Sequence, residues 1–364
     1  MKKLLLILVS AALILSAAFA SAAEDPPKAT VSILKDESLG QIFLNISIDD
    51  FNAFGFRYGD SCDVLFSNGV SLKDIPYYNG YYAKTGDPLI VAYPGYAYVA
   101  VAICNADPSW DYYGCREGDS AAVVRAEAGR YLQVQDALDL VYSNDRADYP
   151  DDERFANFRA MKGGRLREDT FYRGASPVNN MFGRAGYVDE LIRKAGVRFV
   201  LDLADTDEKV RQYAEESRPA YFLSLYESGR VAPLGLTAAS RTETFRASLA
   251  DGLREMMKYE GPYYIHCLEG KDRTGFVCML LEALSGAGTD EITEDYMETY
   301  KSYYGIVPGT AHYQAVLDVK FHDFFDWITG LGDGTPESGA AAYLEQSGMS
   351  ETEIRELQSF LTGE

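Results

Sequence analysis

Within ten residues, His266 to Gly275, stand a cysteine, a lysine and an arginine that together suit attack on a phosphate monoester. Cys267 supplies a nucleophile in its thiolate form, which cationic neighbours at a helix N-terminus favour. Arg273, six residues later, presents a planar guanidinium that can bind two oxygens of a phosphoryl group. Backbone N–H groups of a tight loop before a helix add an anion-binding nest. The segment therefore predicts phosphoryl transfer through a covalent intermediate.

Two plainer interpretations fit this segment less well. A nucleotide-binding P-loop needs Ser or Thr directly after its lysine and a glycine five residues before Gly270, whereas this chain has Asp272 and Ile265 there. A buried structural cysteine does not call for a glycine, a lysine and an arginine around it. The apolar runs 263–265 and 276–281 place the segment between a strand and a helix.

The pattern His-Cys-x-x-Gly-Lys-Asp-Arg-Thr-Gly resembles the phosphate-binding loop of bacterial cysteine-dependent protein tyrosine phosphatases, in the tyrosine and lipid phosphatase branch. The resemblance covers about residues 171–304. It implies an α/β fold with a protein tyrosine phosphatase-like central sheet flanked by helices. It also implies that Cys267 forms a cysteinyl-phosphate, that Arg273 binds the phosphoryl oxygens, and that the Thr274 hydroxyl stabilises the departing thiolate.

The proton donor of this chain differs in position from that of many relatives. Many relatives take it from an aspartate on a separate loop, but this chain has no aspartate between Glu208 and Ala250. The resemblance assigns the role to Asp272, which would protonate the leaving oxygen and then activate water. One alternative is that Asp272 only orients the arginine. The other is that a different carboxylate is the acid, with three candidates: Asp205, Asp207 and Glu227.

The substrate-binding part of the segment is expected to be Leu268, Glu269, Gly270 and Lys271. Lys271 either holds a second phosphate or a substrate carboxylate, or is solvated. Glu269 is expected to point outward, away from a dianion, and His266 to buttress the cysteine by hydrogen bonding. Upstream, residues 171–177 resemble the Tyr-Arg segment before the first helix of these phosphatases. Arg173 is therefore expected to contact substrate or to support the loop, with a surface ion pair as the alternative.

The first 23 residues match a secretory signal peptide, with a basic start at Lys2 and Lys3, an apolar run and small residues at the end. An uncleaved anchor helix is the alternative, but the run is short for a membrane span. We expect export, to the medium, the periplasm or the cell surface, with no stable membrane insertion after cleavage. Cleavage changes the formal charge from −21 to −23. So acidic a chain is not expected to bind nucleic acid or anionic membrane through its overall field.

The cysteines and histidines indicate neither a metal nor another cofactor. Five cysteines, an odd number, leave at least one thiol free in an exported protein. Cys104 and Cys115 flank a turn-rich segment and are the candidate disulfide pair, unless a reducing habitat keeps all five reduced. The chain has three histidines and no Cys-x-x-Cys or His-Glu-x-x-His spacing, so no metal site is expected.

Residues 24–140 have a β-like pattern. Strands are expected at 30–34, 42–46, 89–93 and 96–103, with turn signals between them, which predicts a small β-rich domain of unknown role. Its tyrosines either pack across the sheet, which we favour, or form a face for carbohydrate or peptide. They crowd into one part of the domain: Tyr77, Tyr78, Tyr81, Tyr82, Tyr93, Tyr96 and Tyr98.

A charged segment, 141–170, is expected to join this domain to the catalytic domain, 171–364. The later periodicity is α/β, with strands expected at 197–203, 221–225 and 263–266. Helices are expected at 187–195, 207–216, 237–259, 274–284 and 289–304, and two or three more after residue 308.

The sequence thus predicts a phosphatase acting on a phosphorylated protein or a small phosphate ester, with phosphotyrosine as the leading substrate class. An inositol phosphate or phosphoinositide is the close alternative. A polyphosphorylated ring would call for more cations, and only Lys271, Arg173 and Arg241 offer themselves. A phosphate-binding module that has lost turnover is the alternative of another class.

Overall fold

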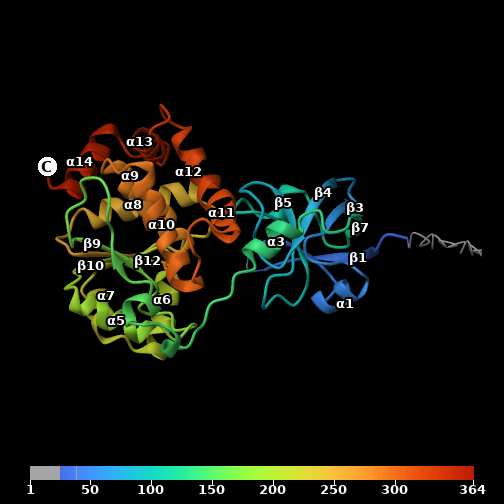
Figure 1. The fold of residues 1–364 in the computed structure, drawn as a ribbon, viewed down its shortest axis with the longest axis horizontal. Coiled ribbons are helices and arrows are strands. Elements are labelled where there is room, and N and C mark those ends of the chain that lie inside the picture. The colour runs from blue at the N-terminus through green and yellow to red at the C-terminus, as the bar shows by residue number, and fades with distance from the viewer. Residues whose placement is uncertain (1–24, 38) are drawn as a thin grey trace, which may run out of the picture.

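The computed structural model describes residues 25–37 and 39–364, which form two units joined by an extended segment (Figure 1). The expected signal peptide, residues 1–23, lies outside the described residues. Among the residues that are described, no helix is long and apolar enough to cross a membrane.

The first unit is a closed barrel with the strand order β1-β2-β6-β5-β4-β3-β7. Neighbouring strands pair antiparallel, except β4 and β5, which pair in parallel. Closure leaves the sheet without a free edge. The strands are β1 (Lys28–Lys35), β2 (Ile42–Leu44), β3 (Ser61–Phe66), β4 (Ser71–Tyr78), β5 (Pro88–Val91), β6 (Ala100–Ile103) and β7 (Ser120–Glu127), and the short helices are α1 (Ile48–Ala53), α2 (Ser109–Tyr112) and α3 (Leu132–Leu138).

The β-rich character predicted for this region is confirmed, and its tyrosines mostly pack. Tyr77 and Tyr78 are buried, and Tyr78 lies with its ring 5.6 Å from that of Tyr82. The predicted disulfide is not formed, because Cys104 and Cys115 are free thiols in two separate apolar clusters.

The second unit, which we call the C-terminal unit (residues 153–364), contains a sheet with the order β11-β10-β12-β9-β8. The four strands from β11 to β9 are parallel, and β8 is antiparallel to β9. Since β8 lies within the predicted junction, the sheet begins before residue 171. The strands are β8 (Arg159–Ala160), β9 (Phe171–Gly174), β10 (Phe199–Asp202), β11 (Val231–Pro233) and β12 (Tyr263–His266).

Helices cover both faces of this sheet (Figure 1). Successive strand residues alternate between the faces, so Ile265 packs with α8 and α9 while Tyr264 packs with α5, α6 and α7. The helices before the loop region are α4 (Asp152–Phe155), α5 (Ala185–Lys194), α6 (Asp207–Ser217), α7 (Ala220–Glu227) and α8 (Glu243–Met256). Those after it are α9 (Asp272–Leu284), α10 (Thr289–Tyr304), α11 (Ala311–Val316), α12 (His322–Thr329), α13 (Pro336–Gln346) and α14 (Glu351–Thr362), with a π-helical turn at Leu317–Phe321.

Two predicted elements are wrong. The strand expected at 221–225 is part of helix α7, whose buried residues Phe222 and Leu225 are three positions apart, as one face of a helix requires. Its short apolar run fits either structure, and only packing on α5 decides between them. The helix expected from residue 237 begins at Glu243, because Thr242 caps it by accepting a hydrogen bond from Phe245 N–H.

Candidate active site

The segment with the nucleophile candidate follows the carboxyl end of β12 and precedes α9. We call residues 267–273 the 267–273 loop. Cys267 is the first residue after the strand and is only 3% exposed, and α9 begins at Asp272. The helix behind the loop is buried over nearly its whole length, from Thr274 to Leu284. The loop therefore sits at the carboxyl edge of a parallel sheet, where α/β proteins commonly bind ligands, with a helix N-terminus directed at it.

The carbonyl groups of the loop are held by hydrogen bonds from outside it. Ser176 N–H donates to the Leu268 oxygen over 3.0 Å. The Asn157 amide donates to the oxygens of Glu269 and Gly270 over 3.1 and 3.0 Å. These bonds hold the loop carbonyls from outside the loop, as an anion nest formed by its N–H groups would require. Sequence reasoning missed Asn157, because nothing in its local pattern connects it with a loop 110 residues later.

Gly270 is required at the tightest point of the loop. Its φ of +70° lies in the left-handed region, and a Cβ there would come within 2.3 Å of the Gly174 backbone. Any side chain would push the loop away from β9.

Arg173 lies behind the loop and not at its mouth. Its guanidinium is 1% exposed, pairs with Asp295 and donates to the Gly270 oxygen over 3.1 Å. Asp295 also pairs with Arg159 over 2.9 Å. Of the alternatives considered for Arg173, the structure shows support of the loop, through a buried ion pair.

His266 touches the backbone of the cysteine. Its Nδ1 lies 3.2 Å from the Cys267 carbonyl oxygen and 3.8 Å from Asp202 Oδ1. Burial lowers the pKa of His266 to about 4, so the imidazole is neutral and weakly basic near pH 7. Its place agrees with the buttressing role expected of it.

Two buried carboxyl groups lie beside this histidine. Burial raises the pKa of Asp202 to about 7, and burial and the charge of Asp202 raise that of Asp205 to about 6. The charge of Arg273 acts on both in the opposite direction. Asp205 is therefore close enough to the loop to be retained as an alternative proton donor.

Arg273 reaches across the loop toward the segment after β11. Its guanidinium donates to the Leu236 carbonyl oxygen over 2.8 Å. That segment lies at the same sheet edge and carries no aspartate, in line with the absence noted in the sequence.

Asp272 and Lys271 lie at the mouth of the loop. The Asp272 side chain is 55% exposed, and its carboxylate is 3.8 Å from Lys271 Nζ. Lys271 donates to the Tyr304 hydroxyl over 3.0 Å and lies 3.5 Å from Glu269. Burial lowers the pKa of Lys271, but the charges of Asp272 and Glu269 outweigh it and hold that pKa well above its usual range. Lys271 is therefore not the solvated lysine of the plainer alternative.

The Glu269 carboxylate accepts a hydrogen bond from Tyr142 and lies 3.5 Å from Lys271 Nζ, and its side chain is 19% exposed. Tyr303 donates to the Glu269 backbone oxygen over 3.2 Å. The tyrosines of α10 have two kinds of environment, since Tyr296 and Tyr300 are buried in the core whereas Tyr303 and Tyr304 donate to or accept from the loop.

Thr274 is fully buried, and its hydroxyl has no hydrogen-bond partner among the described residues. An unpaired buried hydroxyl is costly unless a partner forms during function. Thr274 follows Arg273 on the first turn of α9. This position suits the contact with the Cys267 thiolate that the resemblance implies.

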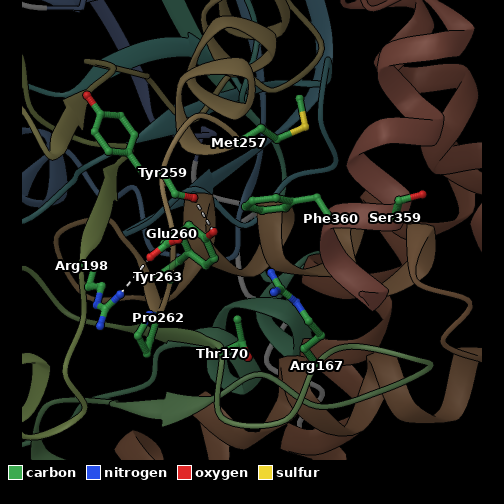
Figure 2. Close-up of a pocket in the computed structure, with 11 residues that line it drawn as sticks. Arg167, Thr170, Arg198, Met257, Tyr259, Glu260, Pro262, Tyr263, Ser359 and Phe360 are labelled. Carbon is green, nitrogen blue, oxygen red and sulfur yellow. Dashed lines mark hydrogen bonds and ion pairs between the residues drawn. The ribbon is translucent and has the colours of Figure 1, made fainter. Parts of the chain in front are cut away.

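A pocket of about 520 Å³ lies elsewhere, at the opposite edge of the sheet (Figure 2). It is lined by residues at the starts of β10 and β12, among them Arg198 and Tyr263, and by Phe360 of α14. Glu260 already pairs with Arg198 there over 3.1 Å. This pocket contains none of the predicted site residues. No group of three metal-ligating side chains occurs among the described residues.

Comparison with known proteins gives one clear match. The model of the tyrosine phosphatase family matches residues 153–363, which is more than half of the chain. Among curated proteins, none matches.

Solved structures are similar only at a low level. The core catalytic domain of the PP-IP phosphatase SIW14 from S. cerevisiae is 15% identical, with 47% of this chain and 94% of that chain covered and a TM-score of 0.26. TpbA from P. aeruginosa, solved with pTyr, is 17% identical, with coverages of 42% and 86% and a TM-score of 0.26. An uncharacterised conserved protein from Thermotoga maritima is 18% identical, with a TM-score of 0.25; 27% of this chain is covered, but only 36% of that one.

Proposed function

The chain belongs to the tyrosine phosphatase family, a cysteine-dependent family of phosphatases, and we propose that it hydrolyses phosphotyrosine in proteins through a cysteinyl-phosphate intermediate. The Cys267 thiolate attacks phosphorus, and the bond from phosphorus to the leaving oxygen breaks as Asp272 donates a proton to that oxygen. Water then attacks phosphorus, Asp272 accepts the proton of the water, and the thiolate leaves as inorganic phosphate is released.

The observation that carries this proposal is the fixation of the loop carbonyls, from outside the loop, around a buried cysteine. Three hydrogen bonds, from Ser176 and Asn157, hold them without any help from substrate. Donors that are positioned before substrate arrives need no reorganisation as charge develops on the phosphoryl oxygens. Arg273 supplies the planar charge, and moving from the Leu236 oxygen to a phosphoryl oxygen exchanges one acceptor for another.

The cations near the loop favour a singly phosphorylated substrate over an inositol polyphosphate. Arg173 is used by Asp295 and the Gly270 oxygen. Arg241 is used by Asp323, with which it pairs over 3.4 Å, and by the Trp327 ring, over which it lies. Lys271 remains, but it sits between two carboxylates. A ring with several phosphates would meet acidic side chains where it needs cations.

The test is a substrate panel run with wild type and Cys267→Ser: a phosphotyrosine peptide, a phosphoserine peptide, inositol hexakisphosphate and a phosphoinositide. We expect the phosphotyrosine peptide to have the largest kcat/KM, and Cys267→Ser to lower it by roughly 10³-fold or more. A preference for either inositol compound would replace the proposed substrate class. Binding of phosphotyrosine without turnover would show a binding module instead.

A further inference from the structure

The segment between the two units is bound to the C-terminal unit shortly before helix α4. The buried guanidinium of Arg184 donates to the Ser143 carbonyl oxygen over 3.1 Å and to the Asn144 side chain over 2.7 Å. The Tyr149 hydroxyl donates to the same Ser143 oxygen over 2.7 Å. Residues 142–144, which the sequence assigns to a charged junction, are therefore held on the C-terminal unit.

Tyr142 contacts the 267–273 loop with its hydroxyl and helix α10 with its ring. The hydroxyl donates to the Glu269 carboxylate. The ring stacks on that of Tyr303, with ring centres 5.0 Å apart and planes at 18°, and meets the Tyr304 ring edge-on at 5.3 Å. The Arg184 guanidinium lies 5.1 Å from the centre of the same ring. Because the ring is held by three neighbours, the hydroxyl is directed at the loop before any substrate binds.

The Glu269 carboxylate in turn holds Lys271. One of its oxygens lies 3.5 Å from Lys271 Nζ, and the two side chains are 19% and 18% exposed. Lys271 Nζ also donates to the Tyr304 hydroxyl over 3.0 Å and lies 3.8 Å from the Asp272 carboxylate. The ammonium is shared among Glu269, Tyr304 and Asp272, so its place depends on where the Glu269 carboxylate is held. A continuous chain of contacts thus leads from Tyr142 to Asp272.

We infer that Tyr142 is a positioning residue of the active site. Through Glu269 it keeps the Lys271 ammonium beside Asp272, and so keeps that carboxyl in place to donate its proton. The inference rests on the proposed function, in which Asp272 is the proton donor. Asp272 is 55% exposed and depends on a partner to restrict its side chain, and misplacing a catalytic group slows the reaction.

The restraint also holds in the state that donates the proton, because an ammonium can donate to the carbonyl oxygen of a protonated carboxyl. Without the Tyr142 hydroxyl, Glu269 is free to pair more closely with Lys271. The ammonium is then drawn away from Asp272, and the proton donor loses its restraint.

The test compares Tyr142→Phe, which keeps the ring and removes the hydroxyl, with Tyr112→Phe, the same change at an exposed barrel tyrosine. The readout is the ratio of kcat/KM for phenyl phosphate to kcat/KM for p-nitrophenyl phosphate, whose leaving group needs less help from an acid. Tyr142→Phe is expected to lower this ratio by about 3-fold, in the same direction as Asp272→Asn. Tyr112→Phe should leave it unchanged. A loss of packing alone would lower both values together and leave the ratio as it is.

A second variant, Glu269→Gln, keeps an acceptor for Tyr142 but loses the charge that holds Lys271. In this background Tyr142→Phe should leave the ratio nearly unchanged, because both substitutions break the same chain of contacts. An unchanged ratio in Tyr142→Phe alone, or an equal loss with and without Glu269→Gln, would overturn the inference and leave the proposed function standing. If wild type turns over neither the phosphotyrosine peptide nor the two aryl phosphates, the proposed function fails, and this inference fails with it.

Discussion

The two sides of the 267–273 loop, its buried rear and its exposed mouth, differ in burial, in hydrogen bonding and in charge. At the rear, Asn157 and Arg173 are buried and donate to loop carbonyls, with Asp295 neutralising the arginine. At the mouth, Asp272 and Lys271 are charged neighbours, and Asp272 is more than half exposed. Under the proposed function, the rear would fix the geometry of phosphate binding, whereas the mouth would carry the proton transfer.

The largest effect is expected from breaking the rear. Arg173→Met leaves one oxygen of the buried Asp295 carboxylate without its arginine and the Gly270 oxygen with Asn157 as its remaining donor, and we expect the free energy of unfolding to fall by about 3 kcal/mol. Turnover should fall with it, because the loop loses a support. Chemical denaturation measures the first effect and a phosphatase assay the second. The matched control is Arg193→Met, whose exposed pair with Glu190 should contribute less than about 0.5 kcal/mol. Equal effects of the two variants would contradict the distinction between rear and surface.

The next largest effect is expected from a substitution at the mouth, which should lower the catalytic rate and leave the unfolding free energy nearly unchanged. Asp272→Asn should lower kcat on alkyl phosphates by about 10²-fold or more, since that leaving group needs a proton, and less on aryl phosphates. The expected change in unfolding free energy is within about 0.5 kcal/mol, because the side chain is half exposed.

The comparison variants are Asp207→Asn and Asp205→Asn. Asp207 is exposed on the first turn of α6 and its variant should keep full activity. Loss of the high-pH limb of the pH–rate profile in Asp205→Asn, with Asp272→Asn still active, would move the proton donation to Asp205.

The last effect concerns the pH dependence of stability and the buried carboxyl behind the loop. The pKa of Asp202 is raised to about 7 in the folded state from an ordinary value of about 3.8, so the folded state holds a proton that the unfolded state releases. The contribution to stability is present below about pH 4 and is lost as pH rises toward 7. Asp202→Asn keeps the acceptor for Ala204 and Asp205 N–H and removes this dependence.

Relative to wild type, Asp202→Asn should therefore gain stability as pH rises from about 4 to 7, as followed by thermal unfolding at several pH values. His266, whose pKa is lowered to about 4, titrates in the opposite direction and stays in both proteins. A stability difference independent of pH would show that Asp202 is ionised in the folded state.

The sequence indicated the residues of the loop itself and, by resemblance, Arg173 behind it, but not the other groups at the rear. Cys267 and Arg273 lie within seven residues, so their spacing indicates phosphate chemistry, whereas the role expected of Asp272 comes from the family resemblance. Asn157 and Asp295 reach the loop from segments more than 20 residues away on either side, and each is an ordinary polar residue in its own segment. Helix α10 was predicted at its observed bounds because its period is long and regular.

In the barrel, prediction found β1, β2, β5 and β6 and missed β3, β4 and β7. The three missed strands contain the charged residues Asp63, Lys73 and Arg125 beside their buried apolar residues, which weakens their local strand pattern. Closure also depends on pairing between β1 and β7, which are separated by almost the whole domain. That pairing is not encoded in any local segment of the sequence.

The most direct test of the central claim is to trap the intermediate. Wild type mixed with a phosphotyrosine peptide, quenched in acid within one turnover and digested, should give one phosphoryl group on the peptide that contains Cys267, as located by mass spectrometry. Asp272→Asn, with slower hydrolysis by water, should accumulate more of it. Turnover of the phosphotyrosine peptide with no phosphoryl group on Cys267, or with one on a different residue, would contradict the account.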